Sequence, residues 1–568
     1  MRRSLIVRLA LLAAALPALA AAQERDTVRV APVLSRDVAR EAAALYNGTA
    51  ALRATDQVEI VEGREVAGNV AVLNGPVIIA GHVTGRVLAI NADVVLRRGA
   101  RIDGDLLVVG GEVEGIEGAT IGGELRVYHP PLRYTMEGER LVAKTDDAPA
   151  EDQWWRRFER RGERNSNRLE LATAGAYNRV EGLPVRLGPV LYRDQGWGHL
   201  RLDAFALLRT GSSFSSSTAD VGHIVHGEIR FGREFGVTLG ALLFDQVDAV
   251  ESWQLAPAEV SLAAFLFQRD YRDYYGRHGG QLSAALRATE NADLTLSYGD
   301  ERWRSRDTRD PPAMPFNEVG WRENPRVDGG RFHVARATLR VDTRNDTFNP
   351  WAGWYLLADF ERGAGSIDDP APTSLGVRFA PVPGEPVRYQ RGFLDVRRYN
   401  RLAPNAALNL RIVAGGWLSG DPLPLERRLS IDGPGTVPGF DFRSPTDVDV
   451  GTCALGAAPA GRPAQCERVA LAQLEYRNDL HVALVGPRGN AFRADGAWVF
   501  FADGGRGWLV NAPGSTLNFG RRDFPPLSTY RTDIGAGLDF DLLGIYVAKA
   551  LSSPEEPANV FLRVQHRF

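Results

Sequence analysis

The segment that decides the fold is the end of the chain, Val560-Phe-Leu-Arg-Val-Gln-His-Arg-Phe568. Its even-numbered residues, from Val560 to Phe568, are mostly apolar, and three of the four residues between them are polar. Because side chains of a β-strand alternate between its two faces, the segment predicts a strand with one apolar and one polar face. A strand of this kind that ends on an aromatic residue is typical of a transmembrane β-barrel, although the edge strand of a soluble sheet fits as well.

The other end of the chain indicates export. Two arginines precede a mostly apolar run from Leu5 to Leu16, and a stretch of small residues follows and ends at Ala22. This order predicts a secretory signal peptide over residues 1–22. No later segment offers the ~20 consecutive apolar residues of a spanning helix, which leaves a periplasmic protein, a secreted protein or an outer-membrane barrel.

Composition favours the barrel. The net charge of −3 gives no electrostatic case for binding nucleic acid. The many glycines and aromatic residues suit strands, turns and the aromatic girdles of a membrane barrel. A chain of 568 residues is expected to hold more than one domain.

The two cysteines, Cys453 and Cys466, have two interpretations. In an oxidising compartment they form one disulfide across a loop rich in Gly, Ala and Pro, which stabilises that loop by about 3 kcal/mol. The alternative is two free thiols. No His lies between or beside them, and no zinc, calcium or nucleotide motif occurs, so we predict no metal, no cofactor and no catalytic site.

A short repeat precedes the barrel. The pattern apolar-x-Gly-x-apolar recurs at Val66–Val70, Val83–Val87, Ile102–Leu106 and Ile121–Leu125, with glycines 17, 19 and 19 residues apart. Short strands with glycine corners at a nearly fixed period predict a β-solenoid over residues 58–128, and the alternative is a small antiparallel sandwich. This region resembles the bactofilin family, some members of which polymerise end to end.

Flanking segments complete the predicted domain plan. Residues 23–57 form a short helical lead, with a helix from Ser35 to Tyr46 that Asn47 and Gly48 end. Residues 129–167 are a linker. Its segment Trp154–Arg161 is aromatic and basic, which fits either a helix on the inner leaflet or an ordinary solvated charge run.

Residues 168–568 are predicted to form an antiparallel outer-membrane barrel. Sixteen strand-like segments occur, and an even count is typical of single-chain bacterial barrels: 169–177, 183–192, 198–208, 223–232, 236–244, 280–288, 293–298, 332–341, 354–361, 389–397, 407–417, 469–476, 494–501, 531–540, 544–550 and 560–568. Leu262–Tyr275 breaks the alternation and is predicted to be helical, on or in the barrel. Because an open edge in lipid leaves backbone groups unpaired, the last strand is expected to pair with the first near Leu169. The predicted fold is therefore all-β: a sixteen-stranded transmembrane barrel behind a small solenoid.

Three segments of the barrel resemble the bacterial surface antigen superfamily of BamA/TamA-like barrels. The first follows a strand and matches the family pattern D-x-R-x-x-x-x-N-P-x-x-G at Asp342, Arg344, Asn349, Pro350 and Gly353. Asp342 and Arg344 share one face of the strand end, and the residues after them turn the chain.

The second segment, Ile431–Arg443, resembles the G-G-x-x-x-V-R-G-F/Y motif of the loop that folds into the lumen of these barrels. The motif residues are Gly433, Gly435, Val437, Gly439 and Phe440, and Pro438 stands where the family has arginine. In the family that arginine reaches acidic groups in the lumen. We expect Arg443 to replace it, with Glu475 or Asp503 as its partner.

The third segment, Trp498–Trp508, resembles the family element F-x-D-x-G-x-x-W, and Asp533–Asp539 and the closing residue Phe568 resemble the last two strands. Tyr177–Leu183 resembles the first-strand element of a related branch. One departure is large, because the solenoid stands where family members carry POTRA domains.

The resemblance implies a role in outer-membrane assembly or in translocation of protein or lipid. The alternatives are an anchor that links the outer membrane to periplasmic partners through the solenoid, and a restricted passive pore. The expected partners are outer-membrane lipid and, through the solenoid, periplasmic proteins or further copies of the chain. An enzyme is not expected, since His223, His226 and His278 stand in no nucleophile motif.

Overall fold

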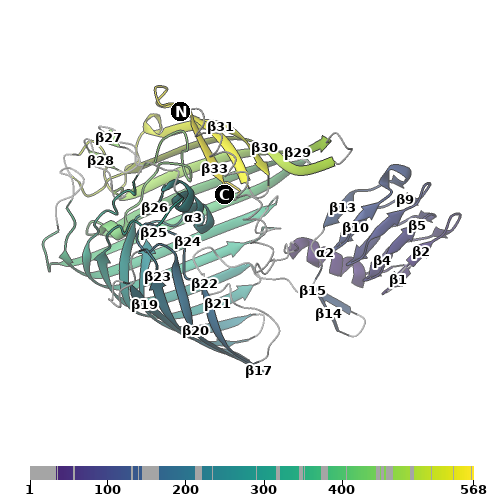
Figure 1. Cartoon of the computed structure of the whole chain (residues 1–568), viewed down its shortest axis with the longest axis horizontal. Helices are drawn as coiled ribbons and strands as arrows, with labels where there is room; N and C mark the ends of the chain where they lie inside the picture. Colours follow the sequence, from purple (N-terminus) through teal and green to yellow (C-terminus); the bar gives the residue numbers. More distant parts are fainter. Residues whose placement is uncertain are drawn as a thin grey trace. The chain divides into compact units, whose positions relative to one another are not determined.

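The chain folds into two compact units, Met1–Ala148 and Pro149–Phe568, in a computed structural model (Figure 1). The structure describes residues 34, 36–50, 52–55, 58–128, 132, 134–137, 140–143, 165–211, 220–232, 235–289, 291–314, 320–344, 350, 352–372, 381–403, 406–442, 448–449, 453–455, 465–485, 491–512, 515–540, 543–564 and 566–568. The predicted signal peptide and the Trp154–Arg161 segment lie outside these residues. Within them, no helix has the length and apolar character needed to cross a bilayer.

The first unit is the predicted β-solenoid. Its strands form three parallel sheets that share the turns of the coil, in the orders β1-β4-β7-β10-β13, β11-β8-β5-β2 and β12-β9-β6-β3. The strand bounds are β1 (Leu52–Ala54), β2 (Val58–Ile60), β3 (Glu65–Val66), β4 (Val70–Leu73), β5 (Val77–Ile79), β6 (His82–Val83), β7 (Val87–Ile90), β8 (Val94–Leu96), β9 (Arg101–Ile102), β10 (Leu106–Val109), β11 (Val113–Glu114), β12 (Thr120–Ile121) and β13 (Leu125–Tyr128).

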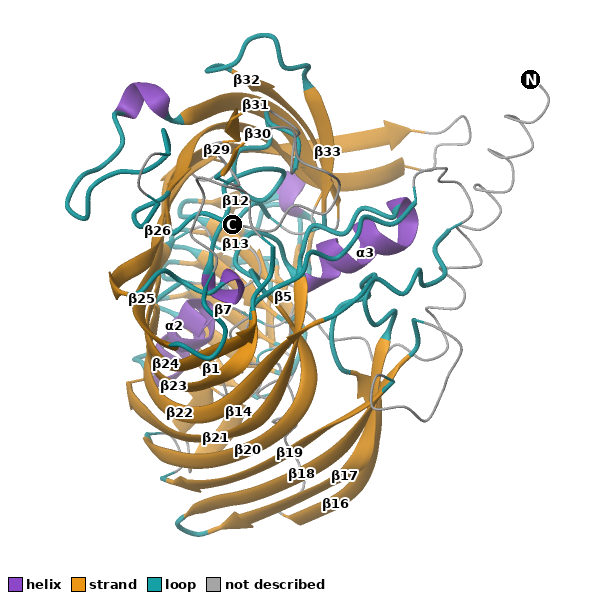
Figure 2. Cartoon of the chain, turned by 90° about the vertical axis from the view of Figure 1, so that its left-hand side faces the viewer, coloured by secondary structure: helices purple, strands orange, loops and turns teal. Residues whose placement is uncertain are grey.

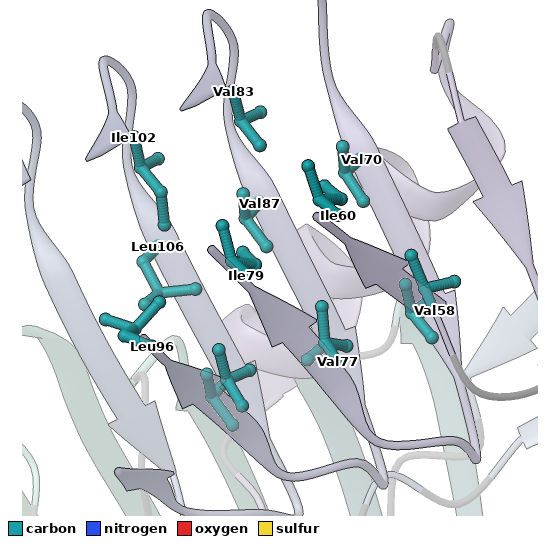
Figure 3. Close-up of a cluster of buried hydrophobic side chains, with 14 of the residues drawn as sticks. Val58, Ile60, Val70, Val77, Ile79, Val83, Val87, Leu96, Ile102 and Leu106 are labelled. Atoms are coloured by element: carbon teal, nitrogen blue, oxygen red, sulfur yellow. The ribbon is translucent and has the colours of Figure 1, made fainter. Parts of the chain in front are cut away.

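The repeat produces the solenoid because each coil places the same apolar positions in one column. Val70, Val87 and Leu106 pair in register across β4, β7 and β10, and all three are buried (Figure 3). Corner glycines let the coils approach closely: a Cβ on Gly85 would lie 2.4 Å from the carbonyl carbon of Gly68 on the neighbouring coil.

The outer side of the first sheet is covered as well. Helix α2 (Arg36–Asn47) packs on it, with Val38, Ala42 and Tyr46 buried among residues of β4, β7 and β10. A hairpin of β14 (Tyr134–Glu137) and β15 (Arg140–Ala143) adds Leu141 to the same core. This hairpin lies within residues 129–167, which are predicted from the sequence to be a linker.

The second unit is one antiparallel sheet of sixteen strands, as predicted. They are β16 (Asn165–Thr173), β17 (Pro184–Gln195), β18 (Gly198–Arg209), β19 (Val221–Phe231), β20 (Gly236–Ala249), β21 (Tyr274–Thr289), β22 (Ala292–Ser305), β23 (Gly329–Asp342), β24 (Gly353–Asp369), β25 (Pro386–Ala403), β26 (Ala406–Gly420), β29 (Arg468–Val485), β30 (Ala491–Trp508), β31 (Arg531–Phe540), β32 (Leu543–Ala550) and β33 (Asn559–Arg563). Helix α3 (Pro257–Phe267) follows β20, and a small pair, β27 (Val448–Asp449) and β28 (Ala454–Leu455), lies between β26 and β29.

The sheet carries its apolar side chains outside and its charges inside. On β18, Leu200 and Leu202 are each 44% exposed, whereas the alternating residues Arg201 and Asp203 are buried. This inversion is the arrangement of a transmembrane barrel, in which the outer face meets lipid and the inner face is polar. Figure 2 shows the sheet curling around the segments that fill its concave side, which is called the lumen below.

The expected closure between the last and first strands is wrong. Among the residues that the structure describes, β33 pairs only with β32, and β16 only with β17. The last strand also ends at Arg563 and not at Phe568. The physical reason is that Arg563, His566 and Arg567 turn toward carboxylates inside the barrel, so the final residues are not available to pair with β16.

Adjacent isoleucines of the solenoid provide a matched test of its core. Ile79→Ala removes a fully buried side chain and is expected to lower the free energy of unfolding of the first unit by about 2–5 kcal/mol. Ile78→Ala on the same strand removes a half-buried side chain of the other face and is expected to cost less. Hydrogen exchange of peptides from residues 58–128 measures both, and equal effects would contradict this core.

Candidate functional site in the barrel lumen

The loop between β26 and β29 folds into the lumen, as the motif at Gly433–Phe440 predicts. From Leu423 to Phe440 every residue except Pro434 is buried. Buried backbone groups must find partners, and this segment finds them on several parts of the barrel. The amide of Leu425, for example, donates to Asp328 Oδ2 at 2.9 Å.

Arg427 makes one of these contacts in a buried site. It lies in a short 3-10 helix, Leu425–Arg427, and its Nε donates to Glu361 Oε1 on β24 at 2.6 Å. Its guanidinium also donates to the Tyr275 hydroxyl at 3.0 Å and lies 4.3 Å from the Trp303 ring centroid. Burial favours a neutral Arg427, but the attraction of Glu361 outweighs burial and raises the pKa of Arg427 well above its ordinary value. The loop is therefore held by a buried charged pair in direct contact.

A second buried pair ties the start of the loop to its end. The Arg428 guanidinium lies 3.4 Å from Glu467, which also accepts hydrogen bonds from the amides of Val510 and Asn511. Burial would raise the pKa of Glu467, but Arg428 and these hydrogen bonds lower it below its ordinary value. Beside this pair, a disulfide joins Cys453 and Cys466 inside an apolar cluster.

The middle of the loop binds the segment that leads to α3. Ser430 donates to Glu251 through both its amide (2.9 Å) and its hydroxyl (2.7 Å). Gln254 Nε2 donates back to the Ser430 carbonyl at 3.0 Å. No side chain fits at Gly435, because a Cβ there would lie 2.4 Å from the Gln254 carbonyl oxygen. The loop and the α3 segment thus form one packed body.

The motif glycines allow close contact with the last strands. Gly433 has a positive φ of 73°, and the Gly439 amide donates to Asp533 Oδ2 on β31 at 2.5 Å. A Cβ on Gly439 would lie 2.6 Å from the Asp533 Cβ, so glycine is required there. Val437 is buried, and Phe440 lies under the Arg531 guanidinium at 4.6 Å. The sequence pattern therefore marks the contact between the loop and β31.

The C-terminal residues enter the same lumen. Arg567 forms a buried ion pair with Asp503 on β30, and its guanidinium stacks 3.6 Å from the Phe501 ring centroid. His566 Nδ1 lies 2.8 Å from Asp539 Oδ2. Phe568 is buried, at 8% exposure, and lies beyond the end of the last strand.

The predicted pairing of Arg443 with Glu475 or Asp503 can be followed only on the acidic side. Arg443 lies outside the described residues, so its pairing stays a prediction. Asp503 has Arg567 as its cation, and Glu475 lies 3.2 Å from Asn409 Nδ2 and 3.6 Å from Arg477. Sequence reasoning missed Arg567, although its inward position followed from the alternation of the closing segment.

The strand-turn motif is a separate structure at one end of β23. Arg344 donates to both oxygens of Asp342 at 2.9 Å and lies 4.8 Å from the Tyr355 ring centroid. Gly353 has a φ of 111° and begins β24, while Pro350 is buried. Asn349 lies outside the described residues. The motif thus shapes the β23–β24 connection, and no described contact joins it to the loop motif.

The histidines show no catalytic arrangement among the described residues. His226 lies 3.7 Å from both Asp203 and Glu228, and His223 stacks edge-on against His278 with centroids 6.0 Å apart. No group of three His, Cys, Asp or Glu side chains in the described part of the chain has the geometry to hold a metal ion.

The barrel is similar in fold to solved barrel structures. BamA from Haemophilus ducreyi lacking POTRA domains 1–3 aligns over 71% of this chain and 70% of that chain, with 14% identity and a TM-score of 0.43. CdiB from Escherichia coli aligns over 76% and 67%, with 11% identity and a TM-score of 0.31. CdiB from Acinetobacter baumannii aligns over 70% and 64%, with 10% identity and a TM-score of 0.29. No protein-family model and no curated protein matches the sequence.

Removing the central loop cation tests the anchoring of the loop. Arg427→Ala leaves Glu361 buried without this cation and is expected to destabilise the barrel by about 3–5 kcal/mol. The effect is measured on a gel as the temperature at which the band of the folded, heat-resistant barrel is lost, which should be lower than for the unsubstituted chain. Proteolysis within residues 421–442 should also be faster than in the unsubstituted chain. Arg326→Ala is the control, because its pair with Asp369 is exposed and is worth about 0–1 kcal/mol. Equal melting of both variants would contradict the anchoring role.

The tail contact has its own test. Arg567→Ala leaves the buried Asp503 carboxylate without its cation and is expected to lower barrel stability by about 3–5 kcal/mol. Adding Asp503→Asn removes that charge, so the double variant is expected to melt above Arg567→Ala. Additive losses in this double-mutant cycle would show that the two side chains do not interact.

Proposed function

We propose that the chain is an outer-membrane barrel that acts in outer-membrane assembly or in translocation of protein or lipid. The observation that carries the proposal is that, among the described residues, β16 and β33 each pair with a strand on one side only and so leave two sheet edges unpaired. A free edge presents unpaired amide and carbonyl groups, which recruit another extended chain by adding a strand. A barrel that only anchors or conducts gains nothing from such an edge in lipid, where unpaired backbone groups are costly.

The folded-in loop supports the same proposal. A lumen that contains the buried segment Leu423–Phe440 offers no wide path for passive flow. Arg427, Arg428 and Ser430 each hold this segment to a buried carboxylate. Action at the seam between β33 and β16 does not require the loop to leave, whereas conduction does. An anchor that works through the solenoid is the second candidate, because the solenoid is a compact unit with cores of its own.

Depletion of the chain from its native cell tests the proposal. The abundance of other outer-membrane barrels, or of lipopolysaccharide, is expected to fall, as measured by proteomics and lipid analysis of isolated outer membranes. The full chain should restore both. An unchanged envelope after complete depletion would overturn a role in assembly or translocation.

A variant that lacks residues 58–128 separates the two candidates. If its barrel folds and restores the envelope, the seam is sufficient for function. If the barrel folds but the envelope defect remains, while a periplasmic protein that the full chain captures is lost, the anchor is favoured.

A further inference from the structure

At the seam between β33 and β16, the last strand is too short to cross the bilayer. A strand needs about 9–11 residues to cross the apolar core of an outer membrane, and β33 has 5. By comparison, β29 and β30, four and three strands away from β33 in the sheet, have 18 residues each. Something other than β33 must therefore separate the lumen from lipid along this side.

Helix α3 contacts the end of β33 and the connection between β16 and β17. Its Glu259 accepts hydrogen bonds from Arg563 Nε at 2.5 Å and from the Val564 amide at 3.1 Å, where β33 ends. Its Ser261 hydroxyl accepts from the amide of Tyr177, shortly after β16 ends, at 3.0 Å. Figure 2 shows α3 between β33 and the first strands of the sheet.

The two sides of α3 differ in exposure, and its only charged residue lies on the buried side. Val260 and Ala264 are fully buried, and Glu259 is buried and paired with Arg563. The outward residues are Leu262 and Phe265, each 41% exposed, and Phe267, 46% exposed. A helix that faces water presents polar residues on its outer side, and α3 presents none.

We propose that the exposed side of α3, formed by Leu262, Phe265 and Phe267, packs against the acyl chains of bilayer lipid and makes α3 the lipid-facing cover of the seam. The apolar band of the barrel continues on both sides of it. Leu169 and Leu171 on β16 are 74% and 70% exposed, as are Val560 and Leu562 on β33 at 68% and 45%. Charge at the helix is confined to the buried Glu259–Arg563 pair, which pins α3 to the last strand. This inference concerns what α3 contacts and holds whichever function the barrel performs.

Site-directed quenching in vesicles tests the contact. Leu262→Cys and Phe265→Cys, each in the full chain, are labelled with bimane under non-reducing conditions, in which Cys453 and Cys466 stay bonded. The labelled proteins are placed in phosphatidylcholine vesicles with or without lipids brominated on their acyl chains. Leu202→Cys is the lipid-facing control and Glu385→Cys, in an exposed turn, is the aqueous control.

The proposal expects brominated lipid to quench both α3 labels to an extent comparable with Leu202→Cys, and iodide to leave them nearly unquenched. Iodide quenching like that of Glu385→Cys, without an effect of brominated lipid, would show that α3 faces water and would overturn it. Protection from both quenchers would also overturn it, because protein would then cover the helix. If one variant fails to give the folded, heat-resistant band, Phe267→Cys replaces it.

Discussion

The barrel depends on one constraint: charges buried in its lumen must be paired. Glu361, at the centre of β24, is fully buried and interacts with Arg427 of the loop, Arg336 of β23 and the Tyr389 hydroxyl. Removing one partner of such a group costs several kcal/mol, whereas the complete network roughly balances its own desolvation. The loop is thus part of the electrostatic balance of the wall, because a barrel without it would leave Glu361 without the Arg427 guanidinium.

The same constraint determines where the sheet stops. Glu259, Asp503 and Asp539 are buried acids near the last strands, and the chain ends with three basic side chains that reach them. Continuing β33 to the C-terminus would add ladder hydrogen bonds, each worth about 0.5–1.5 kcal/mol net. Asp539 keeps Arg477 as a partner in any case, but Asp503 without Arg567 would be buried without its cation, and this would cost more than these bonds return. Turning the tail inward is therefore the favourable choice, and the open seam follows from it.

How much the sequence predicts depends on how far apart the interacting residues lie. All sixteen strands are predictable, because alternation and turn residues are local signals, and the solenoid is predictable from its glycine period. The inward loop is indicated by Gly433 and Gly439, which only make sense where backbone approaches another segment. The pairing of Arg567 with Asp503 and of Arg563 with Glu259 is not predictable, since each joins residues far apart in the chain. The expected closure at Leu169 failed for this reason: the local pattern of the last strand continues to Phe568, but distant carboxylates outcompete it.

The pairing along the sheet also indicates where the barrel yields first. β29 and β30 pair over their full lengths, whereas β32 and β33 are held by only 5 residue pairs. Since each ladder bond contributes a similar small amount, the wall weakens steadily toward the C-terminus. The lumen side is strong, because the loop and α3 are locked together through Ser430, Glu251 and Gln254. A disturbance of this barrel should therefore separate β33 from β32 before it releases the loop from the lumen.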